Sequence, residues 1–182
     1  MKPLLVALAL VVPACTSSTS LPATTSPTTK PEGVADTATV FTPTVAAKET
    51  EGGCGRTTVF MGGIPDTLTR STGDNAPSGL PYAVTHPATA AGFIFGYPLH
   101  APSAGVGYAN KILWVVGAPR TGDLVIDGVP LGKSGPMVHY SFPASSGPGE
   151  IYPSVVDVPE AGCWAFTLRF AGRTAEVELA YR

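Results

Sequence analysis

The sequence predicts an all-β domain, an immunoglobulin-like β-sandwich of about seven to nine short strands. The clearest observation is a period-2 alternation from Cys163 to Phe170, in which the even positions are Trp, Phe, Leu and Phe; this is typical of a half-buried strand. Ala171-Gly172 then turns the chain into a second alternating run, Arg173 to Tyr181, which predicts a β-hairpin. The 21 glycines and 19 prolines interrupt the chain often, and no segment has convincing amphipathic helical spacing. A small β-barrel is the alternative architecture.

Further segments have the composition of strands. Lys111 to Val116 is continuously apolar after its lysine, which favours a central strand covered on both faces. The other expected strands are Arg56–Met61, Ala91–Tyr97, Asp123–Asp127, Pro136–Phe142 and Ser154–Val158. The stretch Gly62 to Pro87 is rich in turn residues, so we expect it to be mostly loop. The folded domain is therefore expected to span residues 51–182.

Charged residues are scarce in this chain. They make up 13% of it, the formal net charge is −2 and the isoelectric point is about 5.9. Proteins that bind nucleic acid carry clustered Lys and Arg that neutralise phosphates. The absence of such a basic field excludes nucleic acid as an expected partner.

The N-terminus has the parts of an export signal. Lys2 supplies a positive charge, Leu4 to Val12 is an unbroken apolar run, and small residues precede Cys15. The run is too short to span a bilayer, which takes roughly 20 residues. Val12-Pro13-Ala14-Cys15 resembles the lipobox of bacterial lipoproteins, with Pro13 an atypical occupant. The resemblance implies a signal peptide over residues 1–14, cleavage before Cys15 and a lipid anchor, including palmitate, on Cys15. An ordinary signal peptide with an incidental cysteine is the alternative.

The segment after Cys15 is unusually rich in hydroxyl residues and proline. Ten Thr, four Ser and four Pro make up 18 of the 30 residues 16–45. A segment of this composition buries too little apolar surface to offset the entropy lost on ordering. We therefore expect residues 15–50 to be a disordered tether, and its Ser/Thr/Pro content also suits O-glycosylation.

With Cys15 assigned to lipid, Cys54 and Cys163 remain as a pair. Outside the cytoplasm such a pair is expected to form a disulfide. A metal site or a catalytic thiol is the rival interpretation, but the chain has no CxxC or CxxH spacing. Trp114 between the two cysteines echoes the immunoglobulin pattern, although the interval from Cys54 to Trp114 is much longer than in that family.

Three segments resemble a family of uncharacterised secreted or lipid-anchored bacterial proteins. They are Ala91–Leu99, Asn110–Trp114 and Tyr152–Trp164, and the resemblance extends over about residues 54–182. The Asn-Lys-Ile-Leu-Trp and Gly-Cys-Trp segments are its most specific parts. The resemblance implies a location in the cell envelope and brings no activity, substrate or cofactor.

The sequence contains no convincing catalytic motif. Gly128 to Ser134 has three residues between its glycines where a phosphate loop needs four, so a hairpin turn is expected there. A hydrolase could draw a triad from Ser154, His139 and Asp157, or paired carboxylates from among three acids. These acids are Asp157, Glu150 and Glu160. Because the acids lie in loop-rich surroundings, solvated side chains are the simpler interpretation.

The three histidines give the main alternative function, an extracytoplasmic copper or zinc site. They are His86, His100 and His139, with Met61 or Met137 as a possible soft ligand. No two of these histidines have the spacing that places ligands on one element. Separate surface or hydrogen-bonded histidines are the simpler interpretation.

The aromatic residues divide into two groups. Trp114 and Trp164 lie within strong strand patterns and are expected in the core. Tyr108 and Tyr152 lie in Gly/Pro-rich stretches and are the candidates for a binding surface.

Taken together, these features favour a non-catalytic binding or accessory module without a cofactor. We expect the protein to be exported and anchored by lipid to the outer face of the cell membrane. Its expected partners are that membrane and an envelope protein or wall component.

Overall fold

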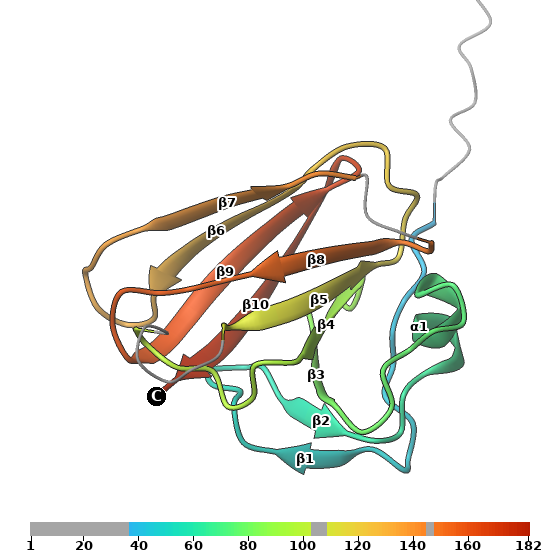
Figure 1. Ribbon diagram of the computed structural model, residues 1–182, viewed down its shortest axis with the longest axis horizontal. Helices are drawn as coiled ribbons and strands as arrows, with labels where there is room; N and C mark the ends of the chain where they lie inside the picture. The colour runs from blue at the N-terminus through green and yellow to red at the C-terminus, as the bar shows by residue number, and fades with distance from the viewer. Residues whose placement is uncertain (1–36, 103–108, 145–147) are drawn as a thin grey trace, which may run out of the picture. The chain divides into compact units, whose positions relative to one another are not determined.

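The computed structural model describes residues 37–102, 109–144 and 148–182, and their regular secondary structure is antiparallel β-sheet apart from one short helix (Figure 1). The elements are β1 Lys48–Thr50, β2 Val59–Met61, α1 Asp66–Ser71, β3 Pro81–Val84, β4 Ala90–Ile94, β5 Lys111–Val116, β6 Leu124–Pro130, β7 Val138–Phe142, β8 Ile151–Val155, β9 Gly162–Phe170 and β10 Arg173–Tyr181. Sheet A has the order β1-β2-β3-β4-β5-β8 and sheet B the order β10-β9-β6-β7. Among the described residues neither sheet closes on itself, so the predicted β-sandwich is confirmed and the alternative barrel is wrong.

The C-terminal hairpin β9–β10 forms as predicted. Its register pairs Phe170 with Arg173, and the turn residues Ala171 and Gly172 both have positive φ angles, of 45° and 69°. This conformation matches the twist of the flanking strands. The even positions of β9 point into the core, and both Trp164 and Leu168 are fully buried.

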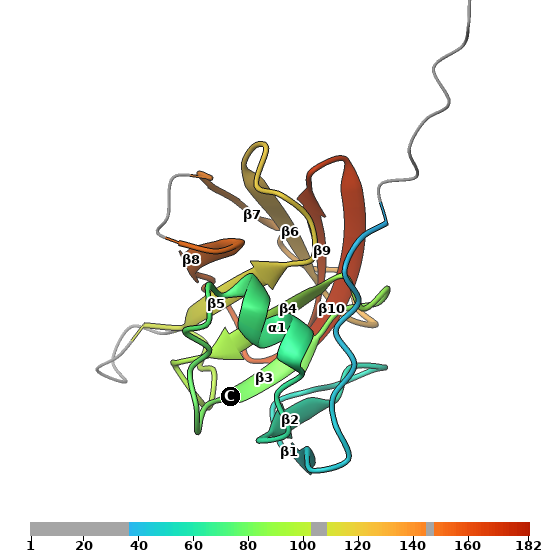
Figure 2. The same ribbon diagram turned by 90° about the vertical axis from the view of Figure 1, so that its right-hand side faces the viewer.

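Sheet A is covered on both faces, which explains the continuous apolar run of β5. Ile112 and Trp114 face the core between the two sheets, whereas Val115 belongs to a second apolar cluster on the other face. That second cluster contains Phe41 and Leu68, the latter from α1. Figure 2 shows α1 in front of sheet A, and Leu68 of the helix shares its cluster with residues of β3, β4 and β5.

Residues 37–50 are part of the folded domain, so the prediction that the tether extends to residue 50 is wrong. The backbone N–H of Thr39 donates to the carbonyl of Gly117, and that of Phe41 donates to Ala88. Phe41 is fully buried, and the segment ends in strand β1. A Cβ atom on Gly117 would lie 2.1 Å from the carbonyl oxygen of Thr39, so this glycine lets the segment approach.

The stretch Gly62 to Pro87 is also more ordered than expected. It contains α1 and β3, and every residue of β3 is buried. Leu68 anchors the helix to the second apolar cluster. Both elements are short and flanked by Gly and Pro, so the sequence has no hydrophobic periodicity there that would predict them.

The predicted disulfide between Cys54 and Cys163 is confirmed, with the two Cα atoms 6.0 Å apart. Cys163 lies on the outward side of β9, since its neighbour Trp164 points into the core. The backbone N–H of Cys54 donates to the carbonyl of Glu178 in β10. The disulfide therefore fastens the loop before β2 against the outer surface of sheet B.

Candidate functional site

A groove lies on the outer face of sheet A, beside the strand pair β2–β3; we call it the β2–β3 groove. It encloses about 250 Å³. Its lining residues are Phe41, Thr42, Pro43, Arg56, Thr58, Phe60, Val84, Thr85, His86 and Ala88. Apolar atoms make up most of its lining surface, and Arg56 and His86 add a charged group and an imidazole.

The N-terminal segment forms one part of the groove, and strands β2 and β3 form another. The N-terminal segment bonds through Phe41 to Ala88, at the turn between β3 and β4. Phe60 of β2 is left half-buried, with its ring 5.8 Å from that of Tyr82. Tyr82 itself is buried and donates to the carbonyl of Gly63, and burial raises its pKa to about 12. The groove therefore has a rigid, aromatic wall.

Charged side chains meet at the Arg56 end of the groove. The guanidinium of Arg56 pairs with the carboxylates of Glu176 and Glu178, which raises the pKa of Arg56, chiefly through the hydrogen bond to Glu176. The backbone N–H of Arg56 also donates to Glu178 Oε2 over 2.5 Å. His86 Nε2 lies 3.0 Å from the carbonyl oxygen of Arg56, which can only accept, so that nitrogen carries the proton. The side chain of Arg56 is 56% exposed, so the cluster orients a surface cation.

This cluster could not have been found from the sequence. Arg56 lies 120 residues from Glu176, and the pairing of the segment at Gly53 and Cys54 with Leu179 and Glu178 of β10 brings the two together. Glu176 and Glu178 appear in the sequence as ordinary outward positions of an alternating strand. No local motif marks them.

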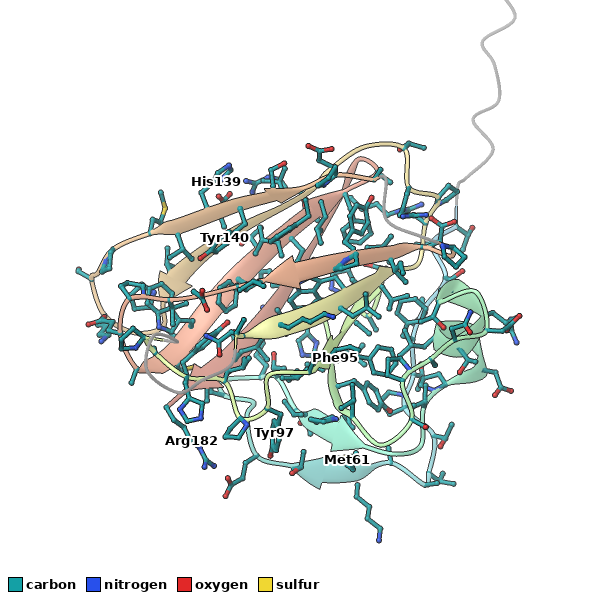
Figure 3. All side chains as sticks on the ribbon, viewed as in Figure 1. Met61, Phe95, Tyr97, His139, Tyr140 and Arg182 are labelled. Carbon is teal, nitrogen blue, oxygen red and sulfur yellow. A yellow bond between two sulfur atoms is a disulfide. The ribbon has the colours of Figure 1, made fainter. Side chains whose placement is uncertain are left out.

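A second polar cluster lies on the outer face of sheet B. Asp127 Oδ1 is 2.6 Å from His139 Nδ1, and Asp127 also pairs with Arg169. The hydrogen bond from His139 is the main cause that lowers the pKa of Asp127, and the bond from Arg169 adds to it. Beside this group, Ser141 Oγ donates to Asp123 over 2.9 Å. Figure 3 shows His139 on the outward side of β7.

The structure does not assemble the candidate triad. Ser154 is buried and its Oγ donates to the carbonyl of Ile112. His139 pairs with Asp127, and Asp157 instead accepts a hydrogen bond from Asn110 Nδ2 over 2.8 Å. Each member thus has its own structural partner.

The candidate carboxylates are likewise engaged separately. Glu150 Oε2 accepts a hydrogen bond from the backbone N–H of Arg120. Glu160 forms a 2.7 Å ion pair with Lys133. The segment Gly128 to Ser134 runs from the end of β6 into the hairpin connection to β7, as expected.

The three histidines lie in different parts of the fold. His86 is at the β2–β3 groove, His139 is on the outer face of β7, and the backbone of His100 is hydrogen-bonded to the side chain of Asn110. Of the two candidate methionines, Met137 is 72% exposed and Met61 lies in β2. Over residues 37–102, 109–144 and 148–182 there is no group of three His, Cys, Asp or Glu side chains that could hold a metal ion.

The aromatic predictions have mixed outcomes. Trp114 and Trp164 are buried in the core, as predicted. Tyr152 is not a surface residue: it is fully buried in β8, and its hydroxyl donates to the carbonyl of Gly122 over 2.7 Å. Its position in β8 places the ring inward, against the core. Tyr108 and Cys15 lie outside the described residues.

Comparisons of the chain with protein-family models, with curated proteins and with solved structures gave no match. In the part of the chain that the structure describes, no helix is both long and apolar enough to cross a membrane. The resemblance to secreted or lipid-anchored bacterial proteins therefore stays a prediction from the sequence.

Proposed function

We propose that this protein is an exported, lipid-anchored binding module that uses the β2–β3 groove to hold an envelope component. The observation that carries this proposal is the groove itself: an apolar hollow with an aromatic wall and a charged end. Small binding sites in proteins commonly combine apolar lining with a few oriented polar groups.

A non-catalytic role fits the way the polar side chains are used. Ser154, Asp157 and Glu150 each bond to a backbone or side-chain group of the fold. Arg56 is held by Glu176 and Glu178, which fixes its position at the rim. Such a group can orient a ligand without taking part in bond breaking.

Photo-crosslinking in intact cells tests the groove. A benzoylphenylalanine at position 60 replaces one ring of the groove wall by a reactive one. We expect it to give a discrete crosslinked product that is missing when the same group is placed at the exposed position of Thr174. Filling the groove with Thr58→Trp should remove the product without changing the melting temperature of the domain. Identical products from positions 60 and 174, or a product that survives Thr58→Trp, would overturn the proposal.

The anchor is tested separately by Cys15→Ala. We expect this change to move the protein from the membrane fraction to the soluble fraction, because two or more acyl chains are needed for stable anchoring. The matched control, Cys54→Ser with Cys163→Ser, should leave the protein in the membrane fraction. Continued membrane attachment of Cys15→Ala, together with no uptake of labelled fatty acid by the wild type, would refute the lipobox interpretation.

A further inference from the structure

Exposed and half-buried side chains alternate along β7 and the residue that precedes it. Met137 and His139 are exposed, whereas Val138 and Tyr140 are half-buried and pack against the core. Residues two apart on an extended chain lie on the same face, about 7 Å from one another. The thioether of Met137, a residue that is 72% exposed, and the imidazole of His139 therefore project from the same outward surface of sheet B.

The imidazole of His139 is held so that one ring nitrogen is left to bind a ligand. Its Nδ1 lies 2.6 Å from Asp127 Oδ1, and hydrogen bonds from His139 and from Arg169 lower the pKa of Asp127. Because an ionised carboxylate only accepts hydrogen bonds, Nδ1 carries the proton, and Nε2 of the neutral ring has the lone pair. A histidine that binds a metal usually donates its other N–H to a carboxylate in this way.

The donors at this place suit a soft, monovalent metal ion. Both oxygens of Asp127 are already engaged, Oδ1 with His139 and Oδ2 with Arg169, and the charge of Arg169 balances that of Asp127. Zn²⁺ needs three or four ligands, drawn mainly from Cys, His and carboxylates. No group of three such side chains is found over the described ranges of the chain. Thioether sulfur selects Cu(I), and imidazole is also a good ligand for copper.

We propose that Met137 and His139 form a binding site for Cu(I), with Met137 Sδ and His139 Nε2 as the two protein ligands. Asp127 orients the imidazole and does not itself bind the ion. Figure 3 shows His139 on the outward side of β7, which belongs to sheet B, whereas the β2–β3 groove lies on sheet A. This inference therefore goes beyond the proposed function and does not depend on it.

Titration of the full chain carrying Cys15→Ala with Cu(I), followed by NMR, tests the site. With Cys54 and Cys163 joined in the disulfide, this chain has no free thiol to compete for the ion. One equivalent of Cu(I), added without oxygen as its acetonitrile complex, should shift the methyl resonance of Met137 and the ring resonances of His139. The methyl resonance of Met61, in β2, should not move, and one equivalent of Zn²⁺ should leave Met137 unchanged. A Met137 methyl that does not respond to Cu(I), or responds equally to Zn²⁺, would overturn the proposal.

Substitutions identify the two ligands. In competition with the Cu(I) chelator bicinchoninate, Met137→Leu and His139→Gln should each weaken binding on the order of tenfold or more. Asp127→Asn keeps both ligands but removes the orienting carboxylate, and it should also weaken binding, by roughly tenfold. Met61→Leu is the matched control and should leave the affinity unchanged.

Met137 and His139 are both exposed, so neither substitution should change the melting temperature of the domain. Binding by Met137→Leu or His139→Gln that is as tight as in the parent chain would place the ion elsewhere and refute the site.

Discussion

Replacing both Cys54 and Cys163 by serine is expected to lower the free energy of unfolding by about 4–5 kcal/mol. The two residues are 109 positions apart. In the chain-entropy model, closing a loop of that length lowers the entropy of the unfolded state, and the folded state is stabilised by about this free energy. For a domain of this size the melting temperature should fall by about 10–15 °C. Urea unfolding followed by tryptophan fluorescence measures the change.

Two controls make this result specific. Cys15→Ala in the wild-type background should leave the unfolding midpoint unchanged, because Cys15 takes no part in the pair. Titration of the folded Cys15→Ala chain should find no free thiol. Two reactive thiols, or an equal midpoint for the serine variant, would contradict a stabilising disulfide.

Phe41→Ala should cost about 3–5 kcal/mol of stability, the usual range for removing a buried phenylalanine ring. Phe41 is fully buried in the second apolar cluster, together with Leu68, Tyr82 and Phe93. Its loss would leave a cavity between the N-terminal segment and the outer face of sheet A. Denaturant unfolding again gives the measurement.

The matched control lies four residues along the same segment. Val45 is fully exposed, so Val45→Ala should change stability by no more than about 0.5 kcal/mol. A cost below about 1 kcal/mol for Phe41→Ala would mean that residues 37–47 contribute little to the fold. Residues 37–47 would then be assigned to the predicted disordered tether.

Periodicity predicted the elements that are long or covered on both faces. The alternation of β9 and β10 and the apolar run of β5 were sufficient, because side-chain burial at these positions follows directly from strand geometry. The disulfide followed from counting cysteines once Cys15 was set aside. The bounds of the shorter strands shifted by a few residues, as at β8, where Ile151–Val155 forms rather than Ser154–Val158.

Predictions from composition were wrong where a few apolar residues lie in a polar stretch. Val40-Phe41 is diluted by the surrounding threonines, yet the ring of Phe41 is buried in the second apolar cluster on sheet A. Tyr152 was misplaced for a related reason, because Pro153 beside it resembles a loop signal although it lies in an edge strand. The β2–β3 groove and the Arg56 cluster depend on contacts between distant segments, which no local pattern records.

The position of the disulfide also has a mechanical consequence. A pulling force applied at Thr39 acts first on the hydrogen bond to Gly117 and then on the buried ring of Phe41. Once these contacts and the pairing of β1 with β2 are broken, the load reaches Cys54 and passes through the sulfur–sulfur bond to β9. The chain between the two cysteines, which are 109 positions apart, is then shielded from the stretch because the load bypasses it.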